Sequence, residues 1–216
     1  MPGRSHLPST LQDPLRPRKK PVQARSAASV NAILEATVQV LLRWGKDRLT
    51  TRRVATRAGV SIGTLYQYFP NKRSLLQAAL RRHMEGVAQA VEQVSREQRG
   101  QPLAEMGAAL ASALITAKMK EGKTGAGLYA VTADVEGQEI SRAMSQIMHW
   151  TICDLLSSSH EKLQDPVLVT TILQGMMAGV SRKLLESAEP DKQFEVIRRE
   201  LVRTVTAYLE QSPRKS

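Results

Sequence analysis

The first regular pattern along the chain is a set of mostly apolar positions that recur every three or four residues from Ser26 to Trp44. They are Val30, Ile33, Leu34, Thr37, Leu41 and Trp44. This spacing places them on one face of a helix, and Gly45 then supplies a residue that readily takes the left-handed conformation at a helix end. The pattern therefore predicts a first helix with one buried face.

Two short helices are predicted next from capping residues, a glycine and a proline. Thr50 can cap a helix that runs to Ala58, and Gly59 can take the positive φ of a tight turn. Ser61 can cap a second helix, which Pro70 ends. The segment is therefore predicted to form two helices joined by a glycine turn.

The rest of the chain continues the helical pattern. Asn71 can cap a long helix that ends before Gly100, and five further helix starts are expected. They lie near Pro102, Gly125, Gly137, Pro166 and Pro190. The sequence shows neither the period-two alternation of strands nor an internal repeat. The expected fold is all-α, with an N-terminal three-helix helix-turn-helix domain at residues 25–70 and a C-terminal helical domain at residues 71–212.

Composition and charge narrow the picture further. Hydrophobic residues make up 42% of the 216-residue chain, but aromatic residues only 4%, which is sparse for a sandwich or barrel of strands. The net charge of +11 is concentrated in residues 1–82, which hold 16 Lys and Arg against three Asp and Glu. Residues 1–24 also carry five prolines, so we expect a disordered basic arm there. A basic excess confined to one segment suits a phosphate-binding surface, and a solvated basic tail is the alternative.

The two short helices have the features of a helix-turn-helix that binds DNA. Ala55 lets the helices cross closely, Gly59 turns the chain, and Leu65 helps to lock the angle between them. The polar side of the second helix then faces outward, where it can enter the major groove and reach base edges. Gly63 has no side chain and so allows a close approach to DNA.

Residues 50–69, followed by Asn71 and Lys72, resemble the DNA-binding segment of the TetR family of repressors. The run from Thr64 to Lys72 is similar to that family's signature at nearly every place. The close resemblance covers roughly residues 26–80, and the remainder resembles the family in its all-helical layout alone.

The resemblance implies a role for each DNA-facing residue. Thr51, Tyr66 and Lys72 would bind phosphates. Arg52 would lie near a guanine or a phosphate. Six residues would face the groove: Ser61, Ile62, Gly63, Thr64, Gln67 and Tyr68. For Tyr66 and Tyr68, packing alone is the alternative to a contact with phosphate.

The resemblance also implies a small-molecule inducer bound in the C-terminal domain. Methionines and a few aromatic residues at helical spacing could line an adaptable apolar pocket. The candidate ligand-binding residues are Met106, Leu110, Tyr129, Met144, Met148 and Trp150. A methionine stripe is also typical of a plain core, so both interpretations stay open. If the pocket lies beside Trp150, enlarging Ala113 should weaken the response to an inducer.

The last two helices carry apolar stripes that could pack against a second copy of the chain. Gly175 and Gly179 allow backbones to approach, as in a four-helix bundle formed by two subunits. The candidate interface residues are Ile172, Met176, Val180, Leu184, Leu201 and Val205. Burial of both stripes within one chain is the alternative. A helix-turn-helix reads a palindromic operator as a two-fold dimer.

The sequence favours no enzyme class. The run from Gly122 to Thr124 resembles the end of a phosphate-binding loop, but Ala117 stands where that motif needs a glycine, and no strand precedes it. The four histidines lie far apart, and Cys153 has no second thiol. His149 could donate to a ligand, although a partly exposed helix histidine is the alternative. We therefore expect no catalytic residues, no metal and no cofactor.

Together these features predict a cytoplasmic, ligand-responsive transcriptional repressor that binds a double-stranded DNA operator as a homodimer. We expect no secretory signal and no contact with a membrane, and a lone cysteine suits a reducing compartment. The alternative is a constitutive or architectural DNA-binding protein without a ligand. Residues 83–216 hold 15 Lys and Arg against 17 Asp and Glu, and this even balance argues against the architectural alternative.

Overall fold

The computed structural model describes residues 24–119, 128 and 135–215. Its helices are α1 (Ala24–Arg48), α2 (Thr51–Ala58), α3 (Ile62–Tyr68), α4 (Lys72–Glu97), α5 (Leu103–Met119), α7 (Val135–Ser157), α8 (Pro166–Leu185) and α9 (Pro190–Gln211). The described residues contain one isolated β-bridge and no strand, so the predicted all-α fold is confirmed. The basic arm before residue 24 and the helix expected near Gly125 lie outside the described residues.

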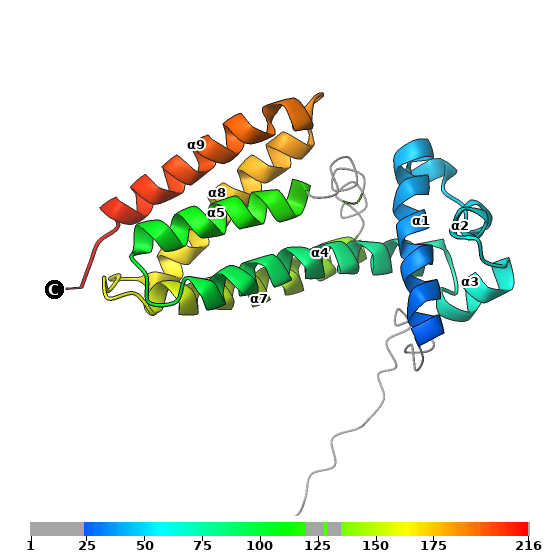
Figure 1. Cartoon of the computed structure of the whole chain (residues 1–216), viewed down its shortest axis with the longest axis horizontal. Coiled ribbons are helices and arrows are strands. Elements are labelled where there is room, and N and C mark those ends of the chain that lie inside the picture. Colours follow the sequence, from blue (N-terminus) through cyan, green and yellow to red (C-terminus); the bar gives the residue numbers. More distant parts are fainter. Residues whose placement is uncertain (1–23, 120–127, 129–134, 216) are drawn as a thin grey trace, which may run out of the picture.

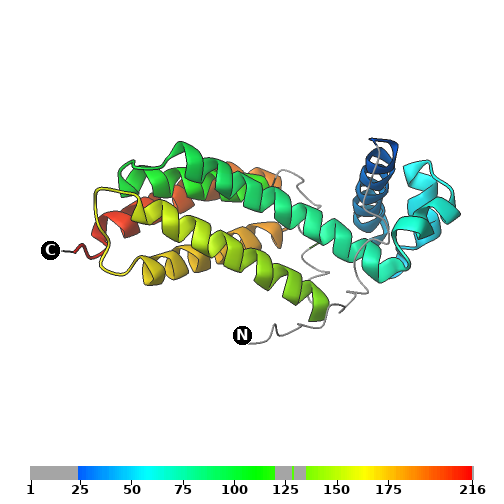
Figure 2. The same ribbon diagram turned by 90° about the horizontal axis from the view of Figure 1, so that it is seen from below.

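Figure 1 shows two groups of helices joined by α4. The helices α1, α2 and α3 gather at the N-terminal end of α4 and form the head. The rest of α4 forms the bundle with α5, α7, α8 and α9, and both views show α4 continuing without a break from one group to the other (Figure 2). In the bundle α4 packs against α5 and α7, and α9 packs along α5.

Local side chains set the ends of the helices in the head. Thr50, Ser61 and Asn71 each accept a hydrogen bond from the backbone N–H three residues later, at 3.3, 2.9 and 2.8 Å. These bonds satisfy N–H groups that a helix start leaves without a partner. Gly59 ends α2 with a φ of 68°. The three predicted caps and the predicted glycine turn are therefore confirmed.

The first helix differs from the prediction at its C-terminal end. Gly45 has a φ of 74°, but a further helical turn follows it, and α1 ends at Arg48 with a kink at the glycine. A residue with a side chain would be strained in this backbone conformation, whereas glycine adopts it at low cost, and the kink therefore lies at Gly45.

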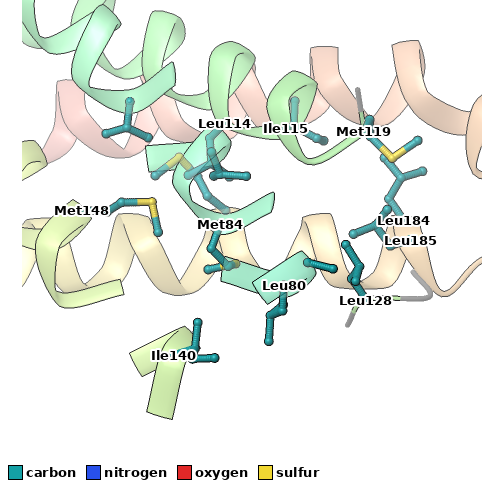
Figure 3. Close-up of a cluster of buried hydrophobic side chains, with 14 of the residues drawn as sticks. Leu80, Met84, Leu114, Ile115, Met119, Leu128, Ile140, Met148, Leu184 and Leu185 are labelled. Carbon is teal, nitrogen blue, oxygen red and sulfur yellow. The ribbon is translucent and has the colours of Figure 1, made fainter. Parts of the chain in front are cut away.

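The bundle has a continuous apolar core, which Figure 3 shows in close-up. Side chains from four helices meet there, among them Leu80 of α4, Leu114 of α5, Met148 of α7 and Leu184 of α8. Burial of such side chains is the main term that holds the helices together. Within the described ranges, no helix has both the length and the apolar composition that crossing a membrane requires.

The helices α5 and α9 approach each other closely at Gly107. A Cβ added to Gly107 would overlap the side chain of Leu209 and would lie 3.0 Å from Cγ1 of Val205. The missing side chain therefore lets α9 lie directly on α5.

Candidate nucleic-acid interface

The crossing of α2 and α3 buries the apolar side of each helix. Ala55 and Leu65, which are predicted to lock this crossing, are 3% and 0% exposed. Phe69 at the end of α3 is also buried. Because the head covers these side chains, the opposite side of α3 is left to face outward.

The outward side of α3 carries most of the residues predicted to face the groove. Ser61, Ile62, Gly63 and Gln67 are exposed, while Thr64 and Tyr68 are half-buried. The hydroxyl oxygens of Thr64 and Ser61 are 2.8 Å apart, so the cap of α3 holds the Thr64 side chain. Tyr68 packs against the apolar core, which supports the packing alternative for its ring.

Two hydroxyl groups predicted to bind phosphate lie side by side. Oγ1 of Thr51, the first residue of α2, is 3.0 Å from Oη of Tyr66 on α3. Tyr66 is 44% exposed, so its ring is not enclosed by the core. Each hydroxyl can donate one hydrogen bond, and phosphate oxygens are strong acceptors. One of the two hydroxyls donates to the other, so the pair offers one free donor at the point where α2 begins, and a second donor if a phosphate replaces their mutual bond.

The two predicted cationic contacts are held differently. Arg52 is exposed in the first turn of α2. Lys72 is half-buried at the start of α4, and its Nζ donates to the carbonyl oxygen of Lys46 at 2.6 Å. This bond joins the end of α1 to the start of α4. Because an ammonium group has three donors, Lys72 can keep the bond and still meet a phosphate.

A further group of cations beside α2 is not identified by the sequence patterns. The guanidinium groups of Arg43 and Arg53 lie over the ring of Trp44, 4.8 and 5.7 Å from its centre. Arg53 also donates to the carbonyl oxygen of Arg48. Helical spacing places Trp44 on the buried face of α1, but the ring is half-buried and carries both cations. The density of arginines around this tryptophan is the signal that could have shown the cluster.

Two family models match the chain. The model of bacterial regulatory proteins of the tetR family matches residues 33–79, which include α2 and α3. The model of the tetracyclin repressor-like C-terminal domain matches residues 102–209, which is half of the chain. The chain belongs to the TetR family. Its α2 and α3 are therefore the helix-turn-helix of a DNA-binding transcriptional regulator.

Curated TetR-family relatives are similar over short segments. The chain is 46% identical over 55 residues to the HTH-type transcriptional repressor KstR of Mycolicibacterium smegmatis, a match that covers 26% of this chain and 27% of that protein. It is 46% identical over 48 residues to the class A tetracycline repressor from transposon 1721 of Escherichia coli, which covers 22% of each chain. These matches span about a quarter of the length of the curated relatives.

Solved structures of TetR-family regulators share the fold over most of the chain. A putative TetR-family regulator from Mesorhizobium loti has a TM-score of 0.72 and 20% identity, covering 87% of this chain and 98% of that chain. The fatty acid degradation regulator FadR from Bacillus halodurans has a TM-score of 0.63 and 19% identity, covering 85% of this chain and 99% of that chain. At such identities the likeness establishes the fold alone.

The residues predicted to line a ligand pocket lie in different environments. Three are buried in the core of the bundle, namely Met106, Leu110 and Met148. Figure 3 shows Met148 among the labelled core side chains. Trp150 is 63% exposed on the surface of α7, Met144 is half-buried, and Tyr129 lies outside the described residues. Three of these candidates are therefore core side chains and Trp150 faces outward, which supports the core alternative for the three, and the ligand-binding role of the set stays a prediction.

A cavity of about 850 Å³ lies instead between α4 and α5. A hollow of about 390 Å³ lies between α1 and α4, and Arg82 and His83 line both spaces. None of the predicted pocket residues that the structure describes lines either space. Ala113, where enlargement is predicted to weaken a response, does line the larger one.

The residues predicted for the dimer interface divide between core and surface. Three of them, Leu184, Leu201 and Val205, are buried within the single chain. These three side chains pack within the single chain, which supports the alternative of intramolecular burial, and the dimer interface itself stays a prediction. The other three lie on α8, where Ile172 is exposed and Met176 and Val180 are half-buried.

His149 contacts neighbouring side chains in the structure, and Cys153 lies in the interior. Nδ1 of His149 lies 2.8 Å from Oε1 of Gln174, which links α7 to α8, and its ring meets the ring of Trp150 edge-on. Cys153 is buried. Among the described residues, no group of three or more His, Cys, Asp and Glu side chains is placed to hold a metal ion.

Proposed function

We propose that this regulator is a repressor that binds a palindromic operator as a homodimer and is released by a small molecule. The observation that carries the proposal is the exposed polar side of α3 beside the hydroxyl pair of Thr51 and Tyr66. Groups that read bases and groups that bind phosphate then share one surface of the head. The relatives KstR and the class A tetracycline repressor are repressors, which supports repression over activation.

Base reading would come from the first half of α3. The amide of Gln67 can pair with adenine, and the side chain of Ile62, which is 41% exposed, can contact the methyl group of thymine. At Gly63 an added Cβ would meet only Oγ of Ser61, at 3.7 Å, so the backbone there is open to an approaching base pair. Arg52 would add a contact to a guanine or a phosphate.

The dimer would form through the outer side of α8, extended by α7. Large apolar side chains are exposed on both helices: Ile147, Trp150, Leu168 and Ile172. The hydrogen bond between His149 and Gln174 joins the two helices, so these exposed side chains are carried by neighbouring helices. A Cβ added to Gly175 or Gly179 would meet no atom within 4 Å, so the backbone of α8 is open to a partner. An apolar surface of this kind marks an interaction site, and a second copy fits the two-fold operator.

Selection of binding sites from random DNA duplexes tests the proposal with the full chain. The expected consensus is an inverted repeat whose half-sites present successive major grooves, about 34 to 36 Å apart. The double variant Thr64→Ala/Gln67→Ala should change the consensus at bases read by α3, while Thr204→Ala, an exposed threonine on α9, should not. A consensus without two-fold symmetry would contradict the dimeric repressor, and an unchanged consensus from the double variant would contradict direct base reading.

A further inference from the structure

Arg82 lies where the two hollow spaces of the molecule meet. It lines the cavity between α4 and α5, and it also lines the hollow between α1 and α4. Among the described residues that line either space, Arg82 is the one arginine or lysine. Its guanidinium group therefore borders both the cavity in the bundle and the first helix of the head.

The contacts that Arg82 makes with the head are weak. Its Nη1 donates to the carbonyl oxygen of Asn31 at 3.3 Å, and its Nη2 donates to Oε1 of Glu35 at 3.4 Å. Both bonds are long, and the side chains of Arg82 and Glu35 are 42% and 64% exposed. Exposed ion pairs of this kind contribute little, because water screens them.

A carboxylate in the cavity would be a better partner for Arg82 than Glu35. A guanidinium group has five donors in a planar fork, and it binds a carboxylate most strongly through two short parallel hydrogen bonds. The single long bond to Glu35 leaves this geometry unused. An acid held by the cavity walls can therefore compete for the fork.

The walls of the cavity suit a small organic acid with a polar body. Beyond Arg82, they offer neutral hydrogen-bonding groups and small side chains. These include Gln89, Gln93, Ser112 and Thr116 together with Gly86 and Ala113. Glu85 is the one carboxylate among the described residues that line this cavity, and it lies three positions from Arg82 on the same helix, so an acid must bind Arg82 against its repulsion.

We propose that the effector of this regulator is an organic acid whose carboxylate binds Arg82 and displaces Glu35. The inference rests on the proposed function, to which it adds the class of ligand and the route of release. When the acid takes the guanidinium group, the bonds to Asn31 and Glu35 are lost, and α1 is no longer held to this part of α4. The operator would bind best while Arg82 links α1 to α4. By linkage, bound operator should then lower the affinity for the acid by the same factor by which bound acid lowers the affinity for the operator.

Calorimetric titration of the full-length protein without DNA tests the ligand class. The probes are three acids with polar bodies, lactate, gluconate and 4-hydroxybenzoate, each with the amide and the amine of the same carbon skeleton. At least one acid should bind saturably, its amide and amine should not, and Arg82→Gln should abolish the binding. Arg81→Gln is the matched control, because it removes an exposed cation from the same helix but lines neither space. Failure of all three acids, or binding of an amine in preference, would overturn the proposal.

Displacement of Glu35 has its own signature. Glu35→Gln removes the charge that competes for Arg82, so acid binding should tighten by about two- to fivefold. Arg82→Lys keeps the charge but loses the planar fork, so it should bind the acid more weakly than the wild type. An acid affinity that Glu35→Gln leaves unchanged or lowers would contradict competition between the two carboxylates.

Anisotropy titrations with the selected operator test the route of release. A saturating concentration of the bound acid should lower wild-type operator affinity by about two- to fivefold, the range that an exposed ion pair contributes, and Arg82→Gln, which already lacks the bonds to α1, should show no further effect. A wild-type protein that binds the operator equally well with and without bound acid would refute the coupling and leave the repressor proposal standing. Failure of the wild type to bind an inverted repeat would instead refute the proposed function.

Discussion

The hydroxyl pair of Thr51 and Tyr66 makes it possible to measure a phosphate contact separately from charge. Tyr66→Phe removes one hydroxyl and keeps the exposed ring. The two hydroxyl oxygens are 3.0 Å apart and share a hydrogen bond, so both can donate to the oxygens of a single phosphate once that bond is exchanged for the phosphate. A hydrogen bond to a charged group contributes about 1.5 to 3 kcal/mol, so Tyr66→Phe should weaken operator binding by about 10- to 150-fold.

The salt dependence of binding distinguishes this loss from the loss of a cation. Tyrosine carries no charge at neutral pH, so Tyr66→Phe should leave the slope of log affinity against log salt unchanged. Arg52→Gln should reduce that slope by about one unit if Arg52 meets a phosphate. The double variant Thr51→Ala/Tyr66→Phe should lose less affinity than the two single losses combined, because both hydroxyls would donate to the same phosphate.

The measurement is an anisotropy titration of a labelled operator at a series of salt concentrations. Tyr208→Phe, which removes the hydroxyl of a half-buried tyrosine on α9, is the matched control. Circular dichroism melts should show that Tyr66→Phe leaves the head folded, since the bond to Thr51 is exposed. Wild-type affinity of Tyr66→Phe, or a change of its salt slope by a full unit, would refute the assignment of this pair to phosphate.

Burial lowers the pKa of Lys118 to about 8. Between about pH 8 and pH 10 the unfolded chain therefore holds a proton that the folded chain has lost, so the free energy of unfolding should rise with pH over this range. In urea titrations the free energy of unfolding of Lys118→Met should exceed that of the wild type by up to about 3 kcal/mol at pH 7, and this difference should shrink as the pH rises. A difference that stays constant with pH would contradict the lowered pKa. Gly107→Ala should destabilise the fold by about 1 to 3 kcal/mol, because the added methyl group would meet α9. Gly86→Ala is the control and should be neutral or stabilising, because no atom lies within 4 Å of the added Cβ. Equal effects would argue against the close α5–α9 contact. Sedimentation should show that Ile172→Glu shifts dimers to monomers, and an unchanged dimer would place the interface elsewhere. Lys72→Ala should reduce the salt slope of operator binding by about one unit, and an unchanged slope would leave Lys72 as a joint between α1 and α4 alone.

The boundaries of α2 and α3 and the start of α4 could be predicted because their signals are local. Thr50, Ser61 and Asn71 each bond to the backbone three residues away, and Gly59 adopts the positive φ of the turn by itself. Such interactions depend on a few neighbouring residues and need no knowledge of tertiary packing. The outward direction of α3 follows in the same way, from the spacing of its apolar positions.

Tertiary packing decides which side chains of the C-terminal domain line a pocket or an interface, and the sequence pattern does not specify that packing. Helical spacing shows which face of a helix is apolar, but not whether the same chain or a second copy covers it. Leu184 and Ile172 belong to one predicted stripe, yet the first is buried within the chain and the second is exposed. Trp150 was expected to line a pocket on the same grounds and lies at the surface.

The cavity between α4 and α5 was missed for a related reason. Small residues such as Gly86 on α4 and Ala113 on α5 line it and leave space between the two helices. Small residues are common in helices for other reasons, and no motif marks a space that side chains fail to fill. The role of Arg82 likewise needs the distance to Glu35, which is 47 positions away in the chain.

The continuity of α4 has a geometric consequence for operator binding. With 26 residues and a rise of about 1.5 Å per residue, this helix is about 39 Å long. A rotation of about 5° at its bundle end would therefore carry the head through about 3 Å, close to the 3.4 Å rise between base pairs. In a two-fold dimer both heads would be displaced, so their separation would change by up to about two base pairs. A few degrees of tilt thus suffice to put one recognition helix out of register while the other remains in its groove.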